Sequence, residues 1–298
     1  MRDLGGVLGP VTTPFDGRGE LARAAFEGNV RTHLEDGLAG ILVAGSTGEA
    51  ALLDEDERAT LIVWARPLVP DDRWLIAGTG AESTRQCVLR CRVAAERGAD
   101  AVLVVAPHYY GSAMTEAALG AHFRRVADES PLPVMLYNIP KYAHFALTPA
   151  LVMDLAAHEN VIGIKDSSGD LALLEQYLEA QGPRFTVLTG NGGTFAGALA
   201  RGSRGGILAV ALFAAPLTMA VLERHDAGDA AGAARAQEPL IPLAARIVGA
   251  LGVAGVKAAL DVAGYAGGPV RSPLLPLEPS QRDEVAALME RSRGTLTV

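Results

Sequence analysis

The run Val161-Ile162-Gly163-Ile164-Lys165 sets the pattern that decides the predicted fold. It is short and apolar up to its last residue, and a longer amphipathic stretch follows it, as expected of the strand and helix of a βα unit. Seven more apolar runs alternate with amphipathic stretches in the same way, at residues 7–13, 40–44, 74–78, 101–106, 133–137, 185–189 and 206–210. Because eight parallel strands close a barrel, we predict a (β/α)8 TIM barrel of the α/β class.

The helical stretches between these runs have recognisable starts. Ser83 with Gln86 three residues later predicts a capping box, and Thr148 followed by Pro149 predicts another helix start. A doubly wound open sheet is the structural alternative, but it needs a glycine-rich turn after the first strand. Residues 10–19 carry Thr-Thr-Pro-Phe instead, which favours the barrel.

A chain of 298 residues can hold one barrel of roughly 250 residues with an appendage. We expect a catalytic barrel over residues 1–226 and a helical C-terminal extension, packed on the barrel, over residues 227–298. The uncharged stretch 205–222 has the length of a membrane span, but Pro216 splits it into an expected strand and an expected helix. We therefore predict no contact with a membrane.

The net charge limits the partners expected for this chain, and the cysteines bear on its cellular compartment. The 34 acidic and 26 basic side chains give a net charge of -8, and no dense basic stretch is present, so nucleic acid is not an expected partner. Cys87 and Cys91 have helical spacing and predict two packed thiols rather than a disulfide. With no apolar block of signal-peptide length before residues 16–23, we expect a cytoplasmic protein.

Catalytic groups of a barrel lie at the C-terminal ends of its strands, where the sixth run ends in Lys165. Lysine is scarce in this chain, since the only others are Lys141 and Lys257. An amine nucleophile must be neutral, and burial favours the neutral form. The alternative is an ion pair with Asp166, whose side chain would point to the other side of the strand. We therefore predict that Lys165 forms a Schiff base.

Two neighbouring strand ends supply further polar groups. Tyr137 closes the fifth run and could relay the protons of imine chemistry, although a tyrosine that packs its ring and leaves its hydroxyl in water is an equal alternative. The segment Gly45-Ser46-Thr47-Gly48-Glu49 follows the second run. It predicts a turn whose consecutive backbone N–H groups and two hydroxyls bind a small carboxylate.

Other motif searches give weaker signals. The six histidines are dispersed and no His-Glu-x-x-His is present, so a metal-dependent lyase lacks a ligand cluster, and we predict neither a metal nor an organic cofactor. The segment Gly190-Asn191-Gly192-Gly193 after the seventh run could cradle a phosphate, but a plain tight turn is the favoured interpretation.

Four segments together resemble the dihydrodipicolinate synthase and N-acetylneuraminate lyase family of class I pyruvate-dependent aldolases. They are Gly45-Ser46-Thr47-Gly48-Glu49, Tyr109-Tyr110, Tyr137-Asn138-Ile139-Pro140 and Gly163-Ile164-Lys165-Asp166-Ser167. The resemblance covers nearly the whole chain in the same order. It extends to Gly268-Pro269-Val270-Arg271-Ser272-Pro273-Leu274, which is similar to the C-terminal signature of the family.

The resemblance implies a barrel with a helical C-terminal part, a homotetramer built as a pair of dimers, and pyruvate bound as an imine. It also assigns roles: Lys165 forms the imine, Tyr137 shuttles protons, Ser46 and Thr47 hold the pyruvate carboxylate, Tyr110 reaches into the neighbouring subunit's site, and Gly190 and Ile207 line the pocket. The role of Tyr110 comes from the resemblance alone.

Two departures from the family pattern concern the substrate. Synthases that make the lysine precursor carry an arginine where this sequence has Tyr142, which we count among the substrate-binding residues, and a glycine where it has His144. Losing the guanidinium removes a bidentate contact of about 1.5–3 kcal/mol, so aspartate semialdehyde should bind poorly unless another group compensates. Leu208 and Leu212 make the far side of the pocket more apolar than a sialic acid lyase needs.

Residues 77–84 and 264–269 look closest to the 4-hydroxy-2-oxoglutarate aldolase branch. We predict a lyase that cleaves or forms a 2-oxo acid, such as 4-hydroxy-2-oxoglutarate or a 2-keto-3-deoxy acid, with pyruvate as one reactant. One alternative is a 4-hydroxy-tetrahydrodipicolinate synthase, which condenses pyruvate with aspartate semialdehyde. An alternative of another class is a noncatalytic regulator that binds a 2-oxo acid.

Overall fold

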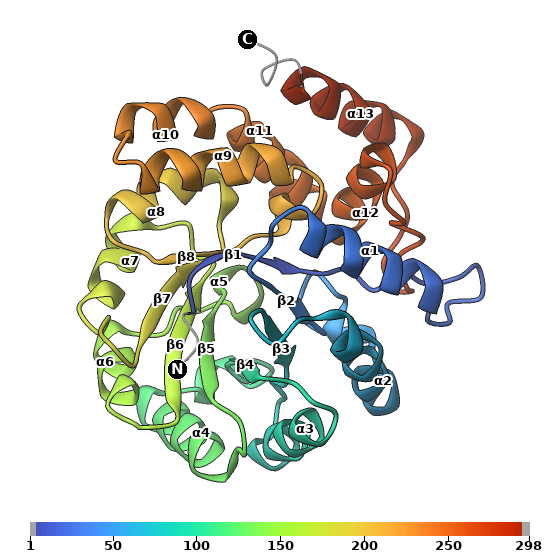
Figure 1. Ribbon diagram of the computed structural model, residues 1–298. Coiled ribbons are helices and arrows are strands. Elements are labelled where there is room, and N and C mark those ends of the chain that lie inside the picture. The colour runs from blue at the N-terminus through green and yellow to red at the C-terminus, as the bar shows by residue number, and fades with distance from the viewer. Residues whose placement is uncertain (1–3, 294–298) are drawn as a thin grey trace.

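The computed structural model describes residues 4–293, and its centre is a closed barrel of eight parallel strands in sequential order (Figure 1). The strands are β1 (Gly6–Pro10), β2 (Gly40–Val43), β3 (Trp74–Gly78), β4 (Ala101–Val105), β5 (Val134–Asn138), β6 (Val161–Asp166), β7 (Thr186–Thr189) and β8 (Gly205–Ile207). The pairing of β1 with β8 closes the sheet, which confirms the predicted TIM barrel.

Two strand ends differ from the prediction. The first strand ends at Pro10, and residues 11–13 continue as irregular chain, although the Val11 N–H still donates to the Leu42 carbonyl. The eighth strand ends at Ile207, and residues 209–212 form the 3-10 helix η5 (Ala209–Leu212). The side chains of that helix are buried like those of a strand, so an apolar run could not separate the two.

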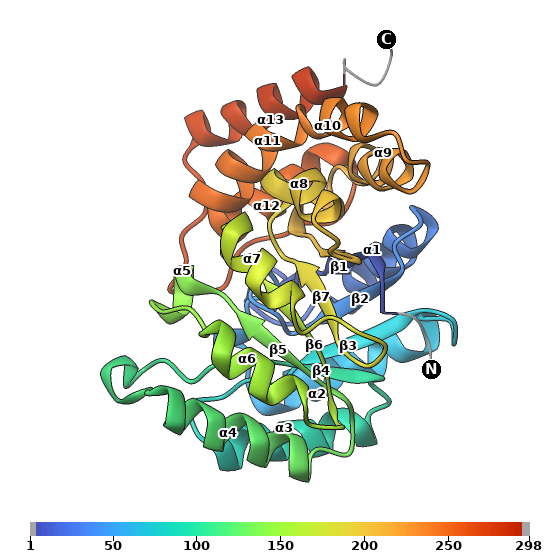
Figure 2. The same ribbon diagram turned by 90° about the vertical axis from the view of Figure 1, so that its left-hand side faces the viewer.

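Helices follow the strands and cover the outside of the barrel (Figures 1 and 2). They are α1 (Arg23–Glu35), α2 (Glu55–Ala65), α3 (Thr84–Glu96), α4 (Glu116–Glu129), α5 (Pro140–Ala143), α6 (Pro149–Ala156), α7 (Leu171–Leu178), α8 (Phe195–Ala200) and α9 (Ala215–Asp226). Shorter 3-10 helices are η1 (Ala50–Leu52), η2 (Arg66–Leu68), η3 (Gly111–Ala113) and η4 (Gly192–Thr194).

The predicted helix starts are largely confirmed. The Thr148 side chain accepts a hydrogen bond from the N–H of Leu151 at the start of α6. The Ser83 side chain accepts from the Gln86 N–H, which forms only half of the predicted capping box. A complete box instead starts α2, where Asp54 Oδ1 accepts from the backbone N–H of Glu57 and Glu57 Oε2 accepts from that of Asp54.

Side chains that alternate along the strands make two cores. One fills the barrel and includes Leu8, Leu42, Leu103, Met135 and Leu188, all at most 2% exposed. The other lies between the strands and the surrounding helices. Cys87 and Cys91 are both free and buried in this outer core, as the sequence predicted. The filled barrel leaves room for chemistry only at the strand ends.

The chain after α9 is helical and gathers on one side of the barrel (Figures 1 and 2). Its helices are α10 (Ala230–Gln237), α11 (Leu240–Pro242), the π-helix η6 (Leu243–Ala250), α12 (Gly252–Ala263) and α13 (Pro279–Arg293). The division of the chain after residue 226 stays a prediction, and residues 294–298 of the expected extension lie outside the described residues. No helix between residues 4 and 293 has the length and apolar character needed to cross a membrane.

Candidate active site

A pocket opens at the C-terminal ends of the strands, and it collects most of the residues that the sequence predicted for the site. Seven of these residues line it: Ser46, Thr47, Tyr137, Tyr142, Lys165, Gly190 and Ile207. They come from segments up to 161 positions apart in the chain, and closure of the barrel brings them together. Tyr110 does not line this pocket.

Lys165 is the penultimate residue of β6 and is 4% exposed. Its register partner on β5 is Tyr137, and the Lys165 Nζ lies 4.4 Å from the centroid of the Tyr137 ring. No hydrogen bond or ion pair within residues 4–293 engages this amine or the Tyr137 hydroxyl. Both groups are therefore available to a ligand in the pocket.

Asp166 does not pair with Lys165, which removes the structural alternative for the lysine. Its side chain points the other way: Asn138 Nδ2 donates to Asp166 Oδ1 at 2.7 Å, and Ser168 Oγ donates to Oδ2 at 2.8 Å. Burial raises the pKa of this carboxyl above its usual value. Asn138 Oδ1 accepts in turn from the Leu147 N–H, so this buried network fixes the ends of β5 and β6 beside each other.

The turn after β2 presents a smaller set of donors than the sequence predicted. The N–H groups of Gly48, Glu49 and Ala50 donate within the turn, to the carbonyls of Gly45 and Ser46. The N–H groups and hydroxyls of Ser46 and Thr47 have no hydrogen-bond partner in the described part of the chain, and both residues line the pocket. Two amides and two hydroxyls therefore remain to bind a carboxylate.

Gly190 is required by close packing around the lysine. A Cβ atom at this position would lie 1.9 Å from Ser167 Oγ and 2.9 Å from Lys165 Cε. The following loop forms a tight turn, in which Asn191 Oδ1 accepts from the Gly193 N–H at 2.9 Å. This geometry agrees with the interpretation favoured from the sequence.

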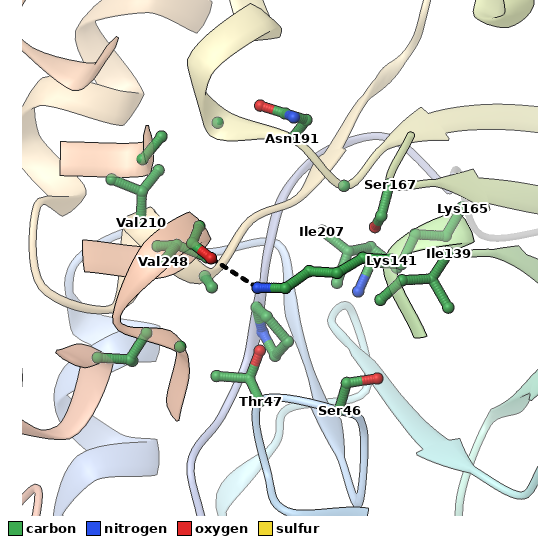
Figure 3. A pocket seen from close by; sticks show the side chains of 18 of the residues that line it. Ser46, Thr47, Ile139, Lys141, Lys165, Ser167, Asn191, Ile207, Val210 and Val248 are labelled. Atoms are coloured by element: carbon green, nitrogen blue, oxygen red, sulfur yellow. Dashed lines mark hydrogen bonds between the residues drawn. The ribbon is translucent and has the colours of Figure 1, made fainter. Parts of the chain in front are cut away.

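Ser167 is a pocket residue to which the sequence analysis gave no role. Its buried hydroxyl has no hydrogen-bond partner, and it lies two residues beyond Lys165, on the same side of the chain (Figure 3). The period of two residues in a strand was the available signal, because it places residue 167 on the face of residue 165.

Lys141 and a wall from the C-terminal extension were also missed. Lys141 Nζ donates to the Gly249 carbonyl of η6 at 2.7 Å (Figure 3). The extension contributes a set of small and apolar residues to the pocket: Ala244, Val248, Gly249, Gly252, Val253 and Val256. The scarcity of lysine was a signal for Lys141, whereas no local pattern connects the extension to the strand ends.

Two further tyrosines differ in their surroundings. Tyr142 lies beside Lys141, whose Nζ is 5.3 Å from the Tyr142 ring centroid, and burial raises the pKa of the Tyr142 hydroxyl. Tyr110 is 70% exposed and packs edge-to-face against Tyr109, which is 78% exposed, with 5.0 Å between ring centroids. An exposed aromatic pair of this kind is available to another protein surface.

In the described part of the chain, acidic, histidine and cysteine side chains do not gather into a metal site. Within residues 4–293 no group of three or more of them could hold a metal ion. His33 and His122 are buried singly in α1 and α4, and burial lowers the pKa of each to about 4. The pocket itself is lined by no aspartate or glutamate.

Comparison with known proteins identifies the family of this chain. The model of the dihydrodipicolinate synthetase family matches residues 3–292. The chain belongs to the dihydrodipicolinate synthetase family. A 4-hydroxy-tetrahydrodipicolinate synthase from Exiguobacterium sp. is 33% identical over 96% of this chain and 97% of its own length. A DapA-like lyase of unknown activity from Halobacterium salinarum is 36% identical over 95% of this chain and 92% of its own length.

Solved structures of the dihydrodipicolinate synthetase family share the fold. Dihydrodipicolinate synthase DapA-2 from Bacillus anthracis has a TM-score of 0.93 and 30% identity, over 97% of this chain and 99% of that chain. A prophage protein of the family from E. coli K12, solved in complex with pyruvate, has a TM-score of 0.91 and 30% identity over the same shares of the two chains. The protein is therefore a carbon–carbon lyase of the class I, pyruvate-using aldolase type.

Proposed function

We propose that this protein forms an imine between Lys165 and the carbonyl carbon of pyruvate or of a larger 2-oxo acid. The observation that carries the proposal is the unpaired, buried amine of Lys165, which lies 4.4 Å from the Tyr137 ring at the rim of the barrel. The free donors of Ser46 and Thr47 line the same pocket and suit the carboxylate of the 2-oxo acid. Gly190 leaves space for the adduct, and Ile207 supplies an apolar surface.

The reaction then follows from these groups. The neutral Lys165 amine adds to C2 of the 2-oxo acid, and the resulting carbinolamine loses water to give the imine. In the cleavage direction the C3–C4 bond breaks, its electron pair forms the enamine, and the departing fragment leaves as an aldehyde. The enamine is protonated at C3, and water hydrolyses the imine to release pyruvate. Tyr137 relays the protons, with the Ser46 hydroxyl as its partner, and the route uses no metal and no organic cofactor.

Two candidates for the reaction of the second reactant have support. Cleavage of 4-hydroxy-2-oxoglutarate or of a 2-keto-3-deoxy acid is supported by Tyr142, which lines the pocket where synthases that use aspartate semialdehyde carry an arginine. Condensation of pyruvate with aspartate semialdehyde, as in a 4-hydroxy-tetrahydrodipicolinate synthase, is favoured by the names of relatives such as the Exiguobacterium protein. Pyruvate release from a panel of 2-oxo acids, beside a coupled assay with aspartate semialdehyde, distinguishes these candidates.

The imine is tested by reduction with borohydride in the presence of pyruvate. We expect a stable adduct on the peptide that contains Lys165, and none after Lys165→Met. Lys141 and Lys257 are the only other lysines, so their peptides are internal controls in the same digest. Pyruvate-dependent labelling of either of those peptides, with Lys165 unlabelled, would overturn the proposal.

We also propose a homotetramer, a pair of dimers in which Tyr110 completes the neighbouring subunit's site. The exposed Tyr109–Tyr110 pair, outside the pocket of its own chain, supports this arrangement. Light scattering measures the molar mass of the assembly and hence its number of subunits. Tyr110→Phe should lower turnover with the assembly intact, whereas Tyr109→Phe, the matched control, should not. A location in the cytoplasm stays a prediction.

A further inference from the structure

We infer that Lys141 binds a second carboxylate, so that the compound joined to or released from pyruvate is an acidic aldehyde. This inference rests on the proposed imine between Lys165 and pyruvate. It adds the chemical class of the compound that reacts with pyruvate or is released from it. It selects among the candidate substrates: 4-hydroxy-2-oxoglutarate and aspartate semialdehyde each supply a carboxylate for Lys141, whereas 2-keto-3-deoxy sugar acids carry a neutral polyhydroxylated chain.

The position of the ammonium is the first part of the argument. Lys141 lies in α5, four residues after Tyr137, and its side chain extends across the pocket toward the C-terminal extension (Figure 3). In this view Ser46 and Thr47 lie to one side of the Lys141 side chain and Asn191 to the other. The ammonium reaches the Gly249 carbonyl of η6 at 2.7 Å. A ligand held by Lys165 and extended toward η6 would meet this charge.

The charge balance of the pocket is the second part. Lys141 and Lys165 are the only basic residues among those that line it, and no carboxylate does. No acidic side chain in the described ranges forms an ion pair with Lys141, whose ammonium uses one of its three donors on Gly249. The remaining donors can bind a carboxylate while the contact with Gly249 is kept. When Lys165 is consumed as an imine, Lys141 still provides a positive charge.

The wall around the ammonium is the third part. Val210, Val248, Val253 and Val256 line the side of the pocket nearest the extension, and their side chains offer no hydrogen-bond partners. A chain of hydroxyl groups against this wall would lose its hydrogen bonds to water without replacement. A short acid that places its charge on Lys141 and its methylene groups on the valines meets no such penalty.

Matched probes test the inference without knowledge of the natural substrate. The probes are the dicarboxylates 2-oxoglutarate and 2-oxoadipate, with 2-oxopentanoate and 2-oxohexanoate as monocarboxylate counterparts of the same chain length. Borohydride trapping at Lys165 is measured as a function of probe concentration, for wild type, Lys141→Met and Lys141→Arg. Methionine keeps an unbranched side chain without charge, and arginine keeps the charge.

We expect wild type to trap the dicarboxylates at a concentration about tenfold to a hundredfold below that for their monocarboxylate counterparts. Lys141→Met should remove this difference by raising the half-saturating concentration of the dicarboxylates alone, and Lys141→Arg should restore part of it. Equal trapping of both classes by wild type would overturn the inference, as would a preference that survives in Lys141→Met, or failure of every longer acid while pyruvate is trapped. Failure of pyruvate itself would instead overturn the proposed imine.

Discussion

The Lys257 ammonium and the Glu49 carboxylate form an ion pair of 2.5 Å, and both side chains are almost completely buried. Glu49 ends the turn that carries Ser46 and Thr47, and it has a left-handed backbone with φ of 57°. Glu49 Oε2 also accepts from the Arg271 N–H, and Lys257 Nζ donates to the Pro269 carbonyl. The C-terminal extension thus holds the proposed carboxylate-binding turn.

Removing the Lys257 charge should therefore affect both stability and binding. Lys257→Met leaves the buried Glu49 carboxylate with the Arg271 N–H but without its ionic partner, and breaking a pair of this kind costs about 3–5 kcal/mol. Urea unfolding measures the loss, with Lys141→Met as the matched control, because Lys141 is an exposed lysine and its loss should change the free energy of unfolding by less than about 0.5 kcal/mol. Equal effects of the two substitutions would contradict the structural role of the pair.

Gly190→Ala should block the imine with a smaller effect on the fold. The added methyl group would lie 1.9 Å from Ser167 Oγ and 2.9 Å from Lys165 Cε, so the lysine must move from its position. We expect pyruvate-dependent trapping to fall at least tenfold. Gly182→Ala is the control, since no atom lies within 4 Å of its Cβ position. Normal trapping by Gly190→Ala would show that this packing is not needed for the reaction.

Tyr137→Phe should slow proton transfer while Lys165 keeps its surroundings. The substitution removes a hydroxyl without a partner in the described residues, and loss of a general acid–base group costs about 100-fold to 10,000-fold in rate. The rate of pyruvate trapping, followed by mass spectrometry of quenched samples, measures this loss. An unchanged rate would leave Tyr137 with the packing role that the sequence also allowed.

His33 should make stability depend on pH in the acid range. Its ring stacks on Tyr265 with 4.9 Å between centroids, both ring nitrogens are buried without hydrogen bonds, and burial lowers the pKa to about 4. The ordinary pKa is about 6.5, so between these values the unfolded chain binds more protons, and stability is complete above about pH 6.5 and is lost as pH falls toward 4.

His33→Phe keeps an aromatic ring and removes this titration. Wild type should lose about 2 kcal/mol more than the variant when the pH falls from 7 to 5. The free energy of unfolding in urea at the two pH values gives the comparison. His122, whose pKa is lowered to about 4 as well, remains in both proteins and contributes equally. An identical loss in both proteins would show that His33 is not a source of the pH dependence.

The barrel and the reactive lysine could be predicted from the sequence because their signals are local. Each buried strand is a short apolar run, and Lys165 interrupts such a run at its end. The end of β8 was misplaced because the residues of η5 are as apolar and buried as those of a strand. The part played by Lys257 required contacts between residues more than 200 positions apart, which no period or motif in one sequence reveals.

The wall formed by Val248, Val253 and Val256 belongs to helices that supply none of the proposed reacting groups. The apolar contacts that favour one substrate over another therefore lie after residue 240, whereas Lys141 and the reacting groups lie at the strand ends before it. A library of substitutions confined to residues 244–256 can change which compound is accepted while the amine and its proton relay stay intact. Divergence of substrate range by this route needs no change in the bond-breaking chemistry.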